Sequence, residues 1–349
     1  MPAIMLVYIK VWLLCCALMV LSMVTLGGYT RLSNAGLSIV EWKPVTGISY
    51  PFTELSWQEE FIKYQQSPEY KYKNFNCSLR EFKKIYFIEY AHRLLGRILG
   101  IVFIVPFFYF LYRGVFSDGF SRNLVGIFAL GTVQSGAGWY MVKSGLSILP
   151  DVSQYRLVLH LLLALTIYGL LMWQYFSLSL VKPLQYKKWQ MVFSIALLGM
   201  SVLQIASGAL VAGLDAGLTY STYPLMDGEM IPNGLFSLQP WYLNIFENIT
   251  TVQFTHRNLA LIILFLTILF SIAMLTSNPS KIAMVAVLCL IFVMFIQFIL
   301  GILTLVNLVP FSLALLHQFC AIMLFTNLLF IVHLSTCKVY CLLRINLKY

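Results

Sequence analysis

The sequence predicts an all-α integral membrane protein with eight transmembrane helices, arranged as two tandem, parallel four-helix bundles that repeat one another. Three observations predict this fold: the composition, the spacing of the charged residues, and short motifs shared by the two halves. Of the 349 residues, 60% are hydrophobic and 10% are charged, and the mean hydropathy is +0.83. Soluble domains carry about a quarter charged residues, so this chain has too few polar side chains to cover a water-facing surface.

Charge-free stretches mark the spans, since a helix needs about 20 apolar residues to cross the hydrocarbon core. Five such stretches are each one helix long: 11–30, 123–142, 157–181, 189–214 and 258–280. The stretch 282–337 is long enough for two helices, with Asn307 and Pro310 at the turn between them. The remaining span covers 85–112. The first stretch is too long for a signal-peptide core and lacks a cleavage site, so we interpret it as a retained helix.

The distribution of basic residues predicts the orientation. With a cytoplasmic N-terminus, the inner segments hold one acidic residue, Asp118, while the outer segments hold the other acidic residues and a similar number of basic ones. The inner basic residues are Lys10, Arg113, Arg122, Lys182, Lys187, Lys188, Lys281, Lys338, Arg344 and Lys348. By the positive-inside rule, both termini are expected in the cytoplasm and the protein in the inner (cytoplasmic) membrane of the cell. The net charge of +10 therefore requires no nucleic-acid partner, and membrane lipid is the expected surrounding.

Two outer loops, roughly 29–84 and 215–253, are long and rich in aromatic and acidic residues. Long loops are often functional, although aromatic loops also lie in membrane interfaces, and both interpretations stay open. Of the seven cysteines only Cys77 is expected outside, so no disulfide within the chain is predicted there.

Short motifs recur between the halves. Residues 34–38 (NAGLS) match 215–219 (DAGLT), and 89–93 (EYAHR) match 253–257 (QFTHR). Gln134 precedes Gly138 by four residues, as Gln297 precedes Gly301. The chain is therefore expected to comprise an N-terminal bundle, 1–181, and a C-terminal bundle, 182–349. Four helices per half give both halves the same orientation, so the repeat is parallel rather than inverted.

Four of the five histidines occupy equivalent positions, within the first two turns of helices that run from outside to inside. They are His92, His160, His256 and His317. A single intramembrane histidine is often only an interhelical hydrogen-bonding residue, but four that recur with the repeat indicate metal ligands. His333 follows His317 by sixteen residues, or about 24 Å along a helix, so it is expected to be unrelated to this set.

Two histidines per bundle, in an apolar interior, are typical of the axial ligands of haem, whereas zinc and copper sites recruit more ligands. Arg93 and Arg257 follow a histidine in each half, where they either bind haem propionates or anchor the helix at the interface. Glu89 lies three residues before His92, but its counterpart is Gln253, which cannot take a proton. This asymmetry indicates that one haem is reacted upon and the other carries electrons, unless Glu89 only pairs with Arg93.

The residues alone indicate an eight-helix membrane protein with two haem sites. Two other classes of protein stay open. One is a bis-histidine di-haem b electron-transfer protein that converts no substrate, for which the Glu89/Gln253 difference has no use. The other is a transporter whose histidines relay protons.

Across essentially its whole length the sequence resembles the haem A synthase family of cytochrome oxidase assembly, in its alphaproteobacterial and mitochondrial branch. The resemblance is carried by 28–33 (GYTRLS), 41–47 (EWKPVTG), 89–97 (EYAHRLLGR), 138–146 (GWYMVKSGL), 222–228 (TYPLMDG) and 254–257 (FTHR). It implies an oxidoreductase that converts the C8 methyl group of haem O to a formyl group by successive hydroxylation, which gives haem A. It also implies haem b as cofactor, and haem O synthase and oxidase assembly factors as partners, with homo-oligomerisation left open.

Carried over by residue, the resemblance implies that His256 and His317 bind the iron of haem b, with Arg257 beside it. His92 and His160 would hold the substrate haem, and Glu89 would transfer or position a proton. Paired outer-loop cysteines of some bacterial relatives are absent here, where only Cys77 is present, so no thiol-assisted step is expected.

Overall fold

A computed structural model describes residues 3–43, 46–147, 150–179 and 187–336. Within these residues the fold is all-α, with one isolated β-bridge between Met226 and Glu229. The long helices are α1 (Ala3–Leu32), α4 (Leu79–Tyr112), α5 (Asp118–Gly145), α6 (Gln154–Ser179), α7 (Lys188–Gly213), α9 (Ile249–Leu275), α10 (Lys281–Val306) and α11 (Phe311–Thr336). The short elements are η1 (Thr46–Ile48), α2 (Glu54–Gln65), α3 (Pro68–Tyr72), η2 (Ala216–Leu218), η3 (Trp241–Leu243) and α8 (Asn244–Glu247).

In the described part of the chain, seven helices are long and apolar enough to cross a membrane, namely all the long helices except α5. The prediction of a multi-pass membrane protein is confirmed. The predicted eighth span does form a helix, α5, but its 28 residues include Asp118, Arg122 and Lys143 as well as several glycines. These residues make α5 less apolar than the other seven long helices.

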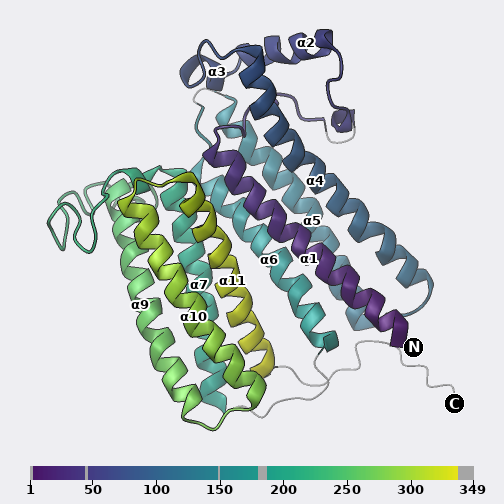
Figure 1. Ribbon diagram of the computed structural model, residues 1–349, viewed down its shortest axis with the longest axis vertical. Coiled ribbons are helices and arrows are strands. Elements are labelled where there is room, and N and C mark those ends of the chain that lie inside the picture. Colours follow the sequence, from purple (N-terminus) through teal and green to yellow (C-terminus); the bar gives the residue numbers. More distant parts are fainter. Residues whose placement is uncertain (1–2, 44–45, 148–149, 180–186, 337–349) are drawn as a thin grey trace.

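The long helices form two neighbouring groups, which Figure 1 shows side by side. In one group α1 packs against α4 and α6, and α5 packs against α6. In the other α7 contacts α9 and α11, and α10 lies between α9 and α11. The boundary predicted at 181–182 lies outside the described residues, as does the C-terminal segment predicted to be cytoplasmic.

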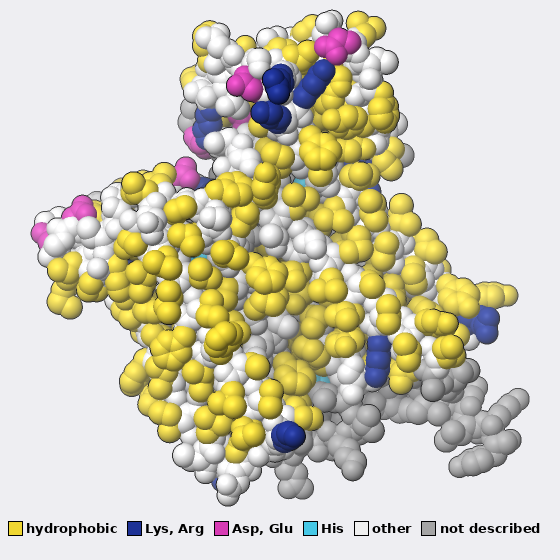
Figure 2. Space-filling model, viewed as in Figure 1, with side chains coloured by type: hydrophobic (Ala, Val, Ile, Leu, Met, Phe, Trp, Pro, Cys, Tyr) yellow, Lys and Arg dark blue, Asp and Glu magenta, His cyan; other side chains and the backbone are white. Residues whose placement is uncertain are grey.

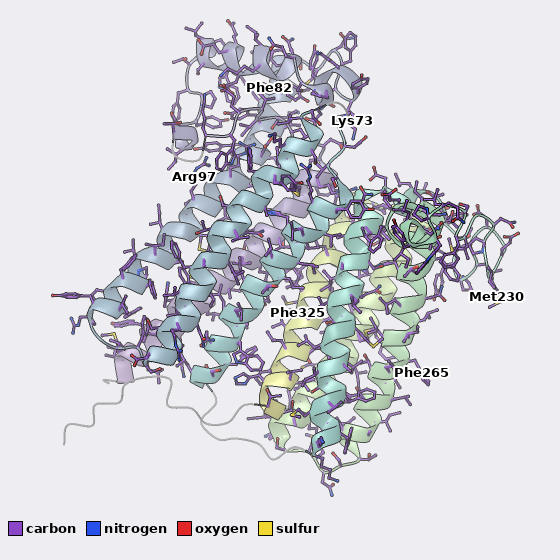
Figure 3. All side chains as sticks on the ribbon, turned by 180° about the vertical axis from the view of Figure 1, so that it is seen from behind. Lys73, Phe82, Arg97, Met230, Phe265 and Phe325 are labelled. Carbon is purple, nitrogen blue, oxygen red and sulfur yellow. The ribbon has the colours of Figure 1, made fainter. Side chains whose placement is uncertain are left out.

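The two groups meet where α6 packs against α7 and α11, and where α1 packs against α11. Tyr168 of α6 and Thr326 of α11 share a hydrogen bond of 2.8 Å between their hydroxyls. Gly169 allows the ring of Phe325 to approach α6, because a Cβ there would lie 3.2 Å from its Cζ. Phe325 is labelled at this junction in Figure 3. Outside the junction, the surface seen in Figure 2 is mostly hydrophobic, as expected for helices that face lipid.

Three polar contacts between loops place them at the same end of the helices. Arg31 pairs with Asp215 at 2.7 Å, and Lys73 pairs with Asp151 at 2.8 Å. Tyr155 donates a hydrogen bond to Glu247 at 2.7 Å. In Figure 2 the acidic side chains gather at this end of the molecule.

The first outer loop is partly helical and covers the start of α4. A capping box between Ser78 and Glu81 starts α4 at Leu79, six residues before the predicted start. Trp57 and Tyr64 of α2 pack on Phe82 and Tyr86 of α4 in a separate aromatic cluster. Helix α4 therefore extends beyond the predicted membrane boundary, because this loop packs on the face of its first turns that carries Phe82 and Tyr86. The five cysteines among the described residues, including Cys77, are free thiols.

Candidate functional site

The four equivalent histidines lie on α4, α6, α9 and α11, as predicted. His160, His256 and His317 each lie within the first two turns of their helix. The same prediction for His92 is wrong, because α4 begins early and places His92 thirteen residues after its start at Leu79. The added turns of α4 pack against the first outer loop.

The histidines form two pairs, one in each helix group. The imidazoles of His92 and His160 lie near each other, and so do those of His256 and His317. Both pairs therefore join two co-directional helices of the same group, α4 with α6 and α9 with α11. This is the arrangement expected when facing helices of a bundle hold a cofactor between them.

Each histidine ring packs against a glycine on the helix that precedes its own. A Cβ atom on Gly138 would lie 2.9 Å from Cε1 of His160, and one on Gly301 would lie 3.0 Å from Cε1 of His317. At Gly208 the distance to Cε1 of His256 would be 3.1 Å. The fourth contact, between Gly27 and Nε2 of His92, would be 3.4 Å. The glycines thus leave room for the imidazoles between neighbouring helices.

A glutamine one turn before the glycine holds three of the four rings. Gln134 donates to the backbone carbonyl of His160 at 3.1 Å, and its Nε2 lies 3.4 Å from the ring Nε2. Gln204 makes the same carbonyl contact with His256 at 3.0 Å. Nε2 of Gln297 lies 3.4 Å from Nε2 of His317. The motif is therefore a glutamine followed, after three intervening residues, by a glycine. Two copies, at Gln134 and Gln297, were predicted from the sequence, and the structure adds the third at Gln204, which has the same spacing to Gly208.

Glu89 is buried and engaged in hydrogen bonds, with only 3% of its surface exposed. Its carboxylate accepts bonds from the Ser38 hydroxyl at 2.7 Å and the Ile39 amide at 2.9 Å, and pairs with Arg93 at 2.6 Å. The predicted pairing with Arg93 is therefore present, but in the interior rather than at the surface. Gln253, the counterpart, instead donates to the carbonyl of Tyr220 at 3.0 Å. The two sites differ in both charge and hydrogen-bond direction.

Both arginines that follow a histidine bind the outer loops. Arg93 donates to the carbonyls of Ile39 and Glu41, at 2.9 and 3.0 Å. Arg257 donates to the carbonyls of Tyr220 and Thr222, at 2.7 and 2.8 Å. The guanidinium groups thus hold equivalent loop segments over the two histidine pairs, and the buried Nε of Arg257 has no partner among the described residues.

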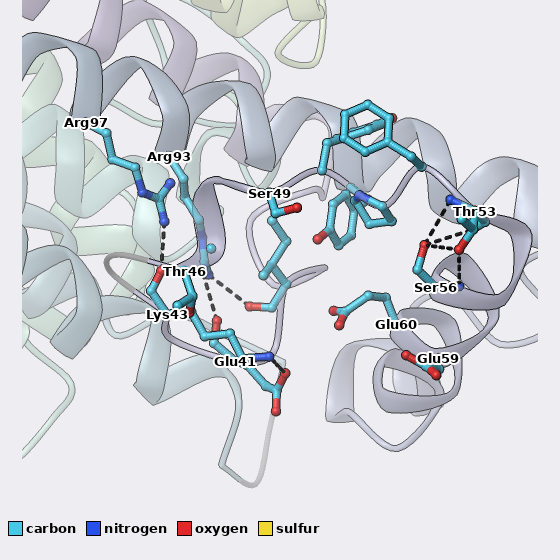
Figure 4. A pocket seen from close by; sticks show the side chains of 16 residues that line it. Glu41, Lys43, Thr46, Ser49, Thr53, Ser56, Glu59, Glu60, Arg93 and Arg97 are labelled. Carbon is cyan, nitrogen blue, oxygen red and sulfur yellow. Dashed lines mark hydrogen bonds and ion pairs between the residues drawn. The ribbon is translucent and has the colours of Figure 1, made fainter.

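A polar pocket of about 440 Å³ lies beside the first outer loop, near the outer part of α4 (Figure 4). Arg93 and Arg97 line it together with Glu41, Glu59 and Glu60. Figure 4 shows Arg97 directed to the carbonyl of Lys43, a bond of 2.9 Å. Charges of both signs line the pocket, so its electrostatics favour no particular ion.

Glu69 of α3 is a second buried carboxyl in the outer region, 3% exposed. The hydroxyl of Tyr64 donates to it at 3.1 Å, and Asn74 donates to that hydroxyl at 2.7 Å. Burial, and secondarily the negative charge of Glu89, raises the pKa of Glu69 to about 7. Glu69 is therefore protonated in the folded protein at a pH where it is ionised in the unfolded chain.

The raised pKa of Glu69 makes the outer region less stable as pH rises. The stabilising contribution of protonated Glu69 to the free energy of unfolding is fully present below the ordinary pKa of 4.5. It is lost as pH rises to about 7, a difference of up to about 3 kcal/mol. Glu69→Gln is expected to remove this dependence, measured by hydrogen exchange of α2 and α3 between pH 5 and 7.5. The exposed Glu59 supplies the control: Glu59→Gln should keep the wild-type profile. Equal profiles for wild type and Glu69→Gln would contradict the assignment.

His333 is separate from both pairs, as predicted. It is fully buried, its Nε2 lies 2.9 Å from the hydroxyl of Ser177, and its ring packs edge-on against Trp173 at 4.7 Å. These contacts are those of a core residue between α6 and α11.

The residues present fit a haem at each pair. Among the described residues no group of three or more His, Cys, Asp and Glu side chains could hold a bare metal ion, whereas two imidazoles complete the coordination of haem iron. The Nδ1 atoms of His160 and His317 are buried and have no hydrogen-bond partner among the described residues. The glycine contacts already described give the rings their space.

The sequence is similar to known proteins over most of its length. Residues 10–329 match the model of the family described as cytochrome oxidase assembly protein. The chain is similar to the haem A synthase of Wolbachia pipientis wMel, with 48% identity over 79% of this chain and 80% of that protein. It is 45% identical to the haem A synthase of Nitrosospira multiformis, over 93% of this chain and 92% of that protein. The haem A synthase of Ehrlichia ruminantium (strain Gardel) is 44% identical over the same shares of the two chains. With a family model that covers nearly all of its spans and relatives this similar over most of their length, the chain belongs to the haem A synthase family of cytochrome oxidase assembly proteins.

Proposed function

We propose that this protein is an enzyme that converts haem O to haem A by oxidising the C8 methyl group to a formyl group through successive hydroxylation. The observation that supports this most is the unequal pair of sites. One histidine pair lies next to a buried carboxylate, Glu89, and the other next to a neutral amide, Gln253. An electron relay without a substrate would have no use for this difference.

Two structural units carry the proposed roles. The unit formed by 1–181 binds the substrate haem through His92 and His160, and the unit formed by 182–349 binds haem b through His256 and His317. When bound, haem b would supply electron transfer. Helix α5 would be the eighth span, and the repeated loop contacts of Arg93 and Arg257 support a duplicated architecture.

The remaining side chains position these ligands and protect the site. Arg257 holds the loop at Tyr220 and keeps its unpaired Nε for a propionate. Glu89 transfers or positions a proton. Ser38, Ile39 and Arg93 keep its carboxylate oriented in the interior. Both termini would face the cytoplasm in the inner membrane. Partners would be haem O synthase, oxidase assembly factors and, in a homo-oligomer, further copies of the chain.

Haem extraction from cells that contain this protein and a source of haem O tests the function. Chromatography is expected to show haem A only when the protein is present. A protein that binds two b-type haems but yields no haem A would support the electron-transfer alternative, and a purified protein without Soret absorption would support a transporter.

Gly208→Ala tests the contact between α7 and the cofactor-binding histidine. The added Cβ would lie 3.1 Å from Cε1 of His256, and such overpacking costs about 1–3 kcal/mol. We expect b-type haem affinity to fall by roughly 5- to 100-fold, measured by haem titration of the purified protein. Gly199→Ala on the same helix is the control, because no atom lies within 4 Å of a Cβ there. Equal affinities for the two variants would show that the close approach is unimportant.

A further inference from the structure

His92 lacks the side-chain hydrogen bonds that hold the other three histidines. The offset that relates Asn34 to Asp215 also relates Met23 to Gln204. Met23 therefore occupies on α1 the position that a glutamine occupies on α5, α7 and α10. The His92 ring donates a hydrogen bond to the backbone carbonyl of Met23, and no side chain of the described residues forms a hydrogen bond with this ring. Its methyl group extends along α4 to 3.5 Å from where a Cβ on Gly96 would lie, one turn beyond His92.

A second polar partner of His256 is also replaced in the N-terminal half. The hydroxyl of Ser207 lies 3.1 Å from Nδ1 of His256, and Nε2 of Gln204 lies 3.2 Å from the same atom. At the position equivalent to Ser207, α1 carries Leu26. Thus two polar side chains contact His256, while the equivalent sequence positions in the N-terminal half carry methionine and leucine.

This difference changes how firmly a ligand histidine is held. A hydrogen bond to the ring of a metal-ligating histidine fixes its orientation, and its loss typically costs about 10- to 100-fold in affinity. Methionine is unbranched and flexible, so it can repack around a ring that tilts. Two side chains thus contact the ring of His256, whereas one hydrogen bond to a backbone carbonyl holds the ring of His92, so His92 can tilt away from a bound iron more readily.

We propose that Met23 and Leu26 make His92 the exchangeable ligand, so that the N-terminal half releases its haem while the C-terminal half retains its own. This inference rests on the proposed function, which requires one haem to enter and leave and the other to stay. Met23 and Leu26 are positioning residues in this role, since they act through the orientation of His92. The α1 face, rather than the identity of the ligands, then decides which haem is substrate and which is cofactor.

Exchanging these side chains between the halves tests the proposal. Purified full-length protein is loaded with haem, and the transfer of haem to apomyoglobin is followed in the Soret band. The double variant Met23→Gln, Leu26→Ser is expected to slow the fast, N-terminal phase by about 10-fold or more. The reciprocal variant Gln204→Met, Ser207→Leu should accelerate the slow, C-terminal phase by a similar factor.

Slower release in the first variant would be a gain of retention, which a misfolded protein does not show. Ser22→Gln is the matched control, because it adds an amide on the exposed face of α1 next to Met23, and it should leave both phases unchanged. If wild type binds a second haem and the exchange of Met23 and Leu26 leaves its transfer rate unchanged, the inference is wrong while the proposed function stands. If wild type binds no second haem, the proposed function fails and the inference fails with it.

Discussion

Replacement of His256 or His317 by leucine is expected to remove the stable b-type haem from the purified protein. Each substitution takes away one of the two imidazoles of the C-terminal pair and leaves Gln204 or Gln297 without its ring contact. Because loss of an outer-shell partner alone costs about 10- to 100-fold in affinity, loss of a ligand should leave less than about a tenth of the haem. The pyridine haemochrome spectrum, normalised to protein, measures it.

His333→Leu is the matched control for these variants. It removes a histidine from the same helix as His317 but outside both pairs. Ser177 keeps a partner in the variant, since its hydroxyl also donates to the carbonyl of Trp173 at 2.8 Å. The expected cost is about 1 kcal/mol of stability with no change in haem content. A normal spectrum in His256→Leu or His317→Leu, or loss of haem in His333→Leu, would contradict the cofactor assignment.

Glu89→Gln is expected to reduce haem A production by about 100-fold, within the range that general acid–base catalysis contributes. Glutamine preserves the shape of the side chain and can still accept from Ser38 and Ile39, but it carries no transferable proton. The b-type haem of the C-terminal half should stay bound, because Glu89 belongs to the other group of helices. Haem A is quantified by chromatography, and haem b in the same sample by its spectrum.

Two controls separate a chemical role of Glu89 from a structural one. Glu54→Gln removes an exposed carboxylate that pairs with Lys83 at 3.1 Å, and it should leave production unchanged. Glu89→Asp keeps a carboxyl group that can exchange a proton and should recover part of the activity. Wild-type production in Glu89→Gln would show the carboxylate to be dispensable, and equal loss of haem A and of folded protein would assign it to the ion pair with Arg93.

The long helices were largely predictable from the sequence because the lipid bilayer restricts which backbone structures can cross it. Apolar stretches must form helices that satisfy their own backbone, so gaps between charges revealed the long helices. Helix α5 is the informative exception, since its glycines and end charges lower its hydropathy. The extension of α4 to Leu79 was missed because polar first turns look like loop until an aromatic cluster buries them.

The sequence by itself determined that this is a multi-pass helical membrane protein with four recurrent histidines and one carboxylate that the other half lacks. These features are local, since spacing along a helix and charge along a chain need no knowledge of neighbours. Only the tertiary structure decided which helix each histidine faces, and that a glycine and a glutamine one turn apart on that helix contact the histidine. Contacts between helices depend on the packing of side chains that are distant in sequence. The periodicity of residues along one helix does not indicate which neighbouring helix each of its faces will contact.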